Sequence, residues 1–325
     1  MTNSSPKNKT KTPELSPRNE NQVHAEPSQQ FVNSSYVHEI TERAMSYMEV
    51  GYPIHLSGPA GIGKTTLAFH IAAQLGQPVT LIHGDDEFRG SDLIGRDSGY
   101  KKTKVVDNYI HTVLRTEEEL MTNWVDNRLT TACINGYTLI YDEFTRSKPE
   151  ANNSLLSILE EKILNLPKLK RQGDGYIEVH PNFKAIFTSN PEEYVGVHKT
   201  QDALMDRLIT MKISHYNRET EILITQAKSG IPKKDAESIV SIVRELRKTG
   251  VNNHRPTIRA CIAIAKVVNY RQLKVNRKDK QFRQVCHDVL HFDSTNVTRD
   301  GHSVMENIVD ETIEKILSTK KQNIK

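Results

Sequence analysis

The sequence Gly58-Pro-Ala-Gly-Ile-Gly63-Lys64-Thr65 fits the pattern G-x-x-x-x-G-K-[ST] and is the strongest structural signal in this chain. It follows a short apolar alternation, residues 52–56, and precedes apolar residues that recur at helical spacing over residues 67–75. Glycines allow the backbone N–H groups to turn inward around a phosphate, and the start of the helix adds positive potential. The stretch therefore predicts a phosphate-binding loop between a strand and a helix.

The chemistry of such a loop assigns a role to its polar residues. Lys64 is expected to reach the β and γ oxygens of ATP, and the hydroxyl of Thr65 is expected to bind Mg²⁺. By chance alone the pattern arises in on the order of one chain in a hundred of this length. The residues expected to contact the nucleotide are Gly58, Pro59, Ala60, Gly61, Ile62, Gly63, Lys64, Thr65 and Thr66.

Four apolar runs around this loop predict an α/β fold with a parallel sheet flanked by helices. The runs are residues 52–56, 79–83, 137–141 and 183–188, and helix-like segments separate them. Ligands on such sheets gather at the carboxyl ends of the strands. Polar residues that directly follow these runs are therefore candidates for the site.

Two runs end in residues suited to phosphoryl chemistry. Asp142 is expected to hold the water shell of Mg²⁺, and Glu143 is expected to polarise the attacking water. Asn190 could hydrogen-bond the γ-phosphate or that water. Each also has a plainer interpretation, because acidic residues and Asn before Pro commonly form turns.

Two arginines are candidates for stabilising charge on the transferred phosphoryl group. Arg207 could act as a finger supplied by a neighbouring subunit, or it could be an ordinary helix arginine paired with Asp202 or Asp206. Arg259 opens a predicted helix and leaves the same two interpretations open.

Composition divides the chain into three parts. Residues 1–30 are rich in Ser, Pro, Asn and Lys and are expected to form a disordered arm, residues 31–216 the nucleotide-binding core, and residues 217–325 a small helical lid domain with a frayed tail. The chain has no run of about 18 apolar residues and no apolar stretch behind its N-terminus, so neither a membrane span nor a secretory signal is expected. The cytoplasm is the expected location.

Several segments together resemble the MoxR branch of the AAA+ ATPases and, within it, the gas vesicle protein N family. The resemblance covers roughly residues 35–315. The segments are SGPAGIGKTTLA, HGDDEFRGSDLIG, YDEFTRSKPEANNSLLSILEEKIL, HPNFKAIFTSNP and DALMDRL.

This resemblance implies a P-loop AAA+ core with a C-terminal helical lid. It implies Lys64 and Thr65 as Walker A, Asp142 and Glu143 as Walker B, Asn190 as sensor 1, Arg207 as the finger and Arg259 as sensor 2. Two insertions, at about residues 95–123 and 164–180, become the candidate partner-contacting surfaces.

The resemblance also implies a homo-oligomeric ring that acts with gas vesicle shell or accessory proteins. A general MoxR-type chaperone or metal-insertion ATPase is an alternative from the same chemistry. A nucleic-acid motor and a noncatalytic ATP-responsive scaffold are alternatives from other classes. The net charge of only +4 argues against nucleic acid as a partner. Glu143 together with Arg207 argues against a noncatalytic scaffold, because a switch needs neither.

Overall fold

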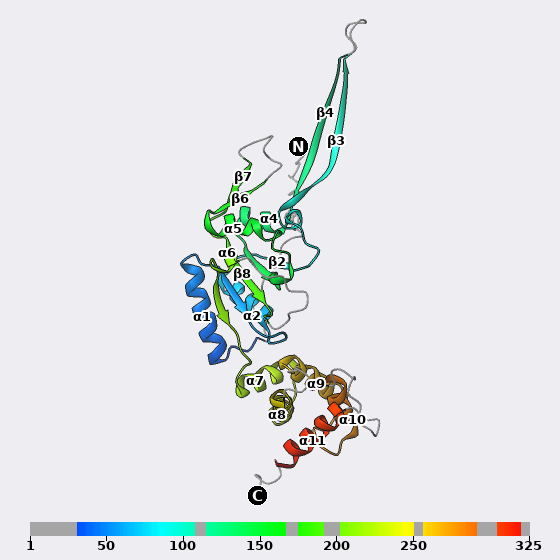
Figure 1. Ribbon diagram of the computed structural model, residues 1–325. Coiled ribbons are helices and arrows are strands. Elements are labelled where there is room, and N and C mark those ends of the chain that lie inside the picture. Colours follow the sequence, from blue (N-terminus) through cyan, green and yellow to red (C-terminus); the bar gives the residue numbers. More distant parts are fainter. Residues whose placement is uncertain are drawn as a thin grey trace, which may run out of the picture.

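The computed structural model describes residues 31–107, 115–166, 175–191, 202–249, 256–290 and 304–319. An α/β region comes first along the chain, and the described elements that follow it are helices (Figure 1). The predicted N-terminal arm and the last residues of the tail lie outside the described residues.

The α/β region is built on a five-stranded sheet in the order β2-β5-β8-β1-β9, in which every neighbouring pair is parallel. The predicted parallel sheet is thereby confirmed, and four of its strands match the four apolar runs. The fifth strand, at the edge beside β1, was not predicted. The strands are β1 (Ile54–Ser57), β2 (Val79–His83), β5 (Thr138–Asp142), β8 (Lys184–Ser189) and β9 (Ile209–Lys212).

Both faces of the sheet are covered, so nearly every residue of its central strands is buried. All five residues of β5 are buried. Its alternate residues enter different cores, because Ile140 packs with the helices of one face while Leu139 and Tyr141 pack with those of the other. Tyr52, expected to belong to the first strand, instead precedes it and is 56% exposed.

Two helices pack on one face of the sheet, and four short helices pack on the side of the sheet that carries Leu139 and Tyr141. On the first face lie α1 (Ser35–Glu49) and α2 (Lys64–Leu75). Elsewhere the α/β region contains α3 (Gly90–Ile94), α4 (Arg128–Asn135), the 3₁₀ turn η1 (Phe144–Arg146), α5 (Asn153–Glu160) and α6 (Asp202–Met205). In α1 the residues Ile40, Ala44 and Met48 recur every four positions and are buried against the sheet.

Two antiparallel hairpins interrupt the α/β region where the insertions were expected. The long one pairs β3 (Gly95–Asp107) with β4 (Arg115–Asp126), and Figure 1 shows it projecting far from the sheet. The short one pairs β6 (Ile163–Asn165) with β7 (Tyr176–Glu178). Their tips, residues 108–114 and 167–174, lie outside the described residues.

Five helices, here called the lid, form a separate apolar core below the sheet in Figure 1. Most large apolar side chains of these helices are buried in it, but Leu223 is 45% exposed. No helix among the described residues has the length and apolar character needed to span a bilayer. The lid helices are α7 (Arg218–Ser229), α8 (Lys233–Thr249), α9 (Ile258–Arg271), α10 (Lys280–Leu290) and α11 (Val304–Thr319).

Candidate active site

The phosphate-binding loop joins β1 to α2, as the sequence predicts. Gly63 caps α2 with a φ of 93°, a left-handed conformation that glycine adopts readily, and it offers no side chain to the first N–H groups of the helix. The dipole of a helix start favours an anion at this position. The loop is therefore shaped to hold phosphate.

The Lys64 side chain lies inside this loop and reaches the end of β8. Its Nζ donates to the carbonyl oxygens of Gly58 at 2.8 Å and Pro59 at 2.7 Å, and also to Oδ1 of Asn190. Both Lys64 and Asn190 are only 6% exposed. Two residues that are 126 positions apart in the sequence are thus brought together, as expected for strand ends on one edge of a sheet.

A second cluster forms between the first turn of α2 and the end of β5. Thr65 Oγ1 donates to Asp142 Oδ1 at 2.7 Å, and Thr188 Oγ1 donates to the same oxygen at 2.6 Å. Hydroxyl and carboxylate oxygens are the ligands that Mg²⁺ prefers, so this pair fits the ion. Thr188 was not predicted, although its place two residues before Asn190 could have suggested it.

Glu143 follows β5 in a left-handed conformation, with a φ of 53°, and several groups fix its direction. Its backbone N–H donates to Thr188 Oγ1 at 2.9 Å. Asn190 Nδ2 donates to Glu143 Oε1 at 3.2 Å, and Arg146 Nη1 lies 2.8 Å from Glu143 Oε2. Asn190 therefore joins the Lys64 cluster to the candidate base. Arg146 was also not predicted, and its only signal was its spacing three residues after Glu143.

His55 lies in β1 beneath the site and links three strands. Its Nε2 is 2.8 Å from Ser189 Oγ in β8, and its Nδ1 is 3.0 Å from Thr210 Oγ1 in β9. Burial, with a further contribution from the charge of Lys64, lowers the pKa of His55 to about 4. The imidazole is therefore neutral near pH 7 and adds no positive charge beside Lys64.

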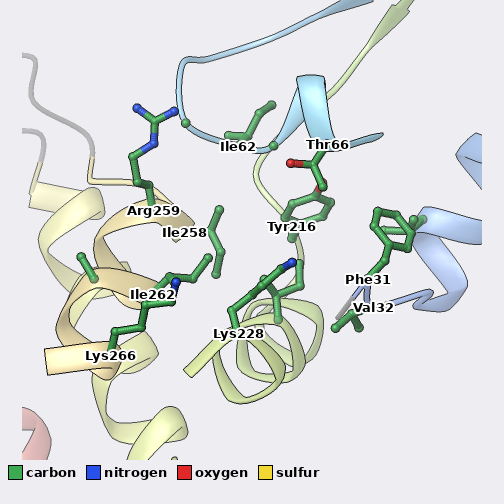
Figure 2. A pocket seen from close by; sticks show the side chains of 15 residues that line it. Phe31, Val32, Ile62, Thr66, Tyr216, Lys228, Ile258, Arg259, Ile262 and Lys266 are labelled. Carbon is green, nitrogen blue, oxygen red and sulfur yellow. The ribbon is translucent and has the colours of Figure 1, made fainter. Parts of the chain in front are cut away.

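A cavity of about 400 Å³ opens beside the loop, between the α/β region and the lid. Figure 2 shows Ile258 and Ile262 of α9 on one side and Phe31 with Val32 on the other, and Tyr216 lies between them. Its largely apolar lining suits the flat face of a nucleobase. The sequence did not reveal this cavity, because its walls come from four distant segments that share no motif.

Arg259 lies at the rim of this cavity. Figure 2 shows its guanidinium reaching from α9 to the level of Ile62 in the loop. Within the described part of the chain this side chain makes no hydrogen bond or ion pair. An exposed cation beside a phosphate-binding loop is placed to meet an anion.

Arg207 does not join the site of its own chain. Its guanidinium donates to Glu160 Oε2 at the end of α5 and to the carbonyl oxygen of Ala203. Neither Asp202 nor Asp206, the partners considered from the sequence, is among these contacts. Arg207 thus bonds to α5 and α6, whereas a finger would act on the site of another subunit.

Comparisons with known proteins agree with this geometry. The profile of the AAA domain (dynein-related subfamily) matches residues 53–208. The gas vesicle ATPase GvpN of Ancylobacter aquaticus is 48% identical over 264 residues, which are 81% of this chain and 74% of that relative. The gas vesicle ATPase GvpN of Haloferax mediterranei is 44% identical over 221 residues, which are 68% of this chain but only 63% of that relative.

Among solved structures, NtrX from Brucella abortus in complex with ADP superposes with a TM-score of 0.50 at 12% identity, over 90% of this chain and 66% of that one. At this identity the likeness concerns the fold alone. The fold, the strand-end cluster and the identity to the Ancylobacter relative lead to one conclusion. This chain belongs to the gas vesicle ATPase GvpN family and is an ATP-hydrolysing enzyme of the AAA+ fold.

Proposed function

We propose that the chain binds ATP with Mg²⁺ between the P-loop and the lid, and that its hydrolysis in a ring drives the assembly or enlargement of gas vesicles. The observation that carries the catalytic part is the double contact of Asn190, which bonds both Lys64 and Glu143. A single amide thus connects the phosphate-binding loop to the group that would activate water. The proposed place of action is the cytoplasm, at the vesicle.

Each part of the nucleotide has a matching surface in this proposal. The base enters the apolar cavity, and the triphosphate lies on the N–H groups of the loop with Lys64 at its far end. Thr65 and Asp142 would hold Mg²⁺, which when bound neutralises charge on the phosphate oxygens. Arg259 adds positive charge from the lid side.

Glu143 is the proposed proton acceptor. A carboxylate has about four lone-pair sites, so contacts with Asn190 and Arg146 leave room for a water to donate to it. Glu143→Gln keeps the shape and removes the basicity. We expect this variant to bind ATP and fail to hydrolyse it, and hydrolysis at the wild-type rate would contradict the assignment.

A site shared by two subunits is proposed because Arg207 contacts Glu160 rather than its own P-loop. Glu143→Gln and Arg207→Ala should each be inactive alone. In a mixed ring, an Arg207→Ala subunit keeps its Glu143 and receives Arg207 from its Glu143→Gln neighbour. Random mixing at equal amounts should restore about a quarter of the wild-type rate, since one interface in four is competent. No recovery in rings shown to be mixed would contradict the shared site.

The gas vesicle part is supported by the relatives, whose names give that association. The β3–β4 hairpin is the proposed client surface, because it projects from the sheet and is paired along its length (Figure 1). Its base suits a clean truncation, since Gly95 pairs with Asp126 and Arg96 with Val125, so a two-residue turn can close it there.

The experiment is complementation of a gas-vesicle-forming host that lacks its own copy of the gene. Wild type should restore vesicles visible by electron microscopy, and Glu143→Gln should not. The hairpin truncation should hydrolyse ATP normally and still fail to restore vesicles. Full rescue by Glu143→Gln would separate the ATPase from vesicle assembly and overturn this part of the proposal.

A further inference from the structure

A buried carboxylate in the lid has no role in the site described above. Glu221, in the first turn of α7, is only 1% exposed. Its Oε2 lies 2.7 Å from Arg244 Nη1 and its Oε1 lies 2.8 Å from Arg247 Nη1. Buried ion pairs of this kind contribute little net stability compared with apolar residues of the same size. A role in fixing geometry is the better explanation for placing one here.

Both arginines also hold the backbone where the lid meets the α/β region. Arg244 Nη1 donates to the carbonyl oxygen of Tyr216 at 3.1 Å, and Arg247 Nε donates to that of Pro256 at 2.7 Å. Tyr216 lines the cavity. The buried carboxylate is therefore connected, through one arginine each, to the cavity wall and to the chain just before α9.

The segment after Pro256 carries the groups that face the P-loop. Thr257 caps α9, and its Oγ1 would lie 2.6 Å from a Cβ added at Gly61. Arg259 follows two residues later and reaches toward Ile62 (Figure 2). A displaced Pro256 would displace both.

The first turn of α9 packs close to the same ion pairs. Burial raises the pKa of the Cys261 thiol, and the charge of Glu221 raises it further. The packing shows the same arrangement, because Ile222 of α7, Leu246 of α8 and Cys261 of α9 lie in one apolar core. The ion pairs and the start of α9 thus form one packed unit.

We propose that Glu221 and Arg247 are positioning residues that hold Arg259 against the P-loop. This inference rests on the proposed role of Arg259 in nucleotide binding. Arg247 acts through two contacts of different kinds: a charge contact with Glu221 and a directed hydrogen bond to Pro256. Arg247→Lys separates them, because lysine keeps the charge but lacks the planar group that reaches two acceptors at once.

The test is a double-mutant cycle between Arg247→Lys and Arg259→Ala, read by ATP affinity in calorimetry and by kcat and KM. Losing the hydrogen bond from Arg247 to Pro256 should misplace Arg259. ATP binding should then weaken roughly tenfold, which is the order of magnitude for losing one charge-assisted hydrogen bond to the nucleotide. In the Arg259→Ala background the same change should alter affinity less than about twofold, because the group being positioned is gone. Equal losses in both backgrounds, or no loss in either, would overturn the inference.

Arg283→Lys is the matched control. Arg283 also joins carboxylates to a backbone carbonyl, since it contacts Asp310, Glu314 and the carbonyl oxygen of Arg277, but it lies in α10, away from α9's first turn. The Arg283→Lys variant should keep an ATP affinity within about twofold of wild type. A loss equal to that of Arg247→Lys would show a general effect of lid stability and would also overturn the inference.

A substitute variant and the choice of ATP affinity as the readout keep the outcomes distinct. If Arg247→Lys is too unstable to assay, Glu221→Gln replaces it in the same cycle with the same expected pattern. Affinity for ATP is measurable even without turnover, so a wild type that binds but does not hydrolyse ATP would refute the proposed function while leaving this cycle decisive.

Discussion

Gly61→Ala offers a direct test of the contact between the P-loop and the lid. Gly61 has a φ of 72°, and a Cβ added there would meet Thr257 Oγ1 at 2.6 Å. The left-handed backbone alone should cost about 1–2 kcal/mol for alanine. The clash adds to this, because Thr257 is held by its place at the start of α9 and must move.

Gly76→Ala separates the two effects. Gly76 has a nearly equal φ of 68°, yet nothing lies within 4 Å of an added Cβ. Its substitution should therefore lower the free energy of unfolding by about 1–2 kcal/mol and leave ATP affinity unchanged. Gly61→Ala should lower the free energy of unfolding further and also weaken ATP binding, because Arg259 moves with Thr257.

Urea unfolding and calorimetric ATP titration of both variants form the assay. Thr257→Ala should partly rescue Gly61→Ala, since it removes the oxygen that clashes while costing about 1 kcal/mol as a lost helix cap. The reasoning would be refuted if the two glycine variants had equal free energies of unfolding and equal ATP affinities. It would also be refuted if Thr257→Ala and Gly61→Ala were simply additive.

Three further predictions concern buried groups. Thr188→Val removes the partner of the Glu143 N–H and one donor to Asp142. It should therefore lower the free energy of unfolding by about 1–3 kcal/mol and lower kcat at least about tenfold. ATP affinity measured by calorimetry should stay nearly unchanged. The pKa of His55 is lowered to about 4 in the folded state, whereas the unfolded chain keeps the ordinary value of 6.5. The unfolded state therefore binds a proton first as the pH falls, so the free energy of unfolding is at its full value above pH 6.5 and should fall by roughly 3 kcal/mol as the pH drops from 6.5 to 4. Urea unfolding across this range should show that slope, and His55→Gln should remove most of it. Phe282→Ala should destabilise the lid by about 3–5 kcal/mol in urea unfolding, because the ring is fully buried, whereas Tyr270→Ala, at a side chain that is 90% exposed, should change stability by less than about 0.5 kcal/mol.

The strand-end residues could be predicted because a single rule of parallel sheets brings them together. Asp142 ends β5, and Glu143 and Asn190 directly follow β5 and β8, whose apolar runs are visible in the sequence. The carboxyl ends of such parallel strands meet on one edge of the sheet. The P-loop motif then fixes which edge. Local pattern and global topology agree at these positions, so the sequence predicts that these residues lie together.

The fifth strand escaped prediction for an equally physical reason. β9 has only four residues, Ile209–Lys212, and lies at the sheet edge, where Met211 is the one residue that is buried. A short edge strand needs little apolar sequence. Its position beside β1 is set by pairing with that strand, which no local pattern encodes.

The contacts that orient the candidate base were also beyond the sequence. Thr188 and Arg146 both contact Glu143, but one lies 45 residues away and the other forms a surface pair of a kind that usually means little. Their importance comes from the left-handed backbone of Glu143, which turns its N–H toward β8. Such a conformation is not specified by residue type, since glutamate rarely adopts it.

The two ends of the bound nucleotide would contact different parts of the molecule. This difference predicts which part of the lid is released first after hydrolysis. The phosphates would meet residues of the sheet edge, whereas half of the cavity for the base is built by α7 and α9 of the lid. In the proposed complex, loss of the γ-phosphate would leave the base contacts intact and would remove the anion that faces Arg259. Because Arg259, Thr257 and Pro256 belong to one short segment tied to Glu221, we expect hydrolysis to release the start of α9 before the rest of the lid. Hydrogen exchange should then rise first at α9's first turn when ADP replaces ATP, and a uniform rise over all five lid helices would contradict this order.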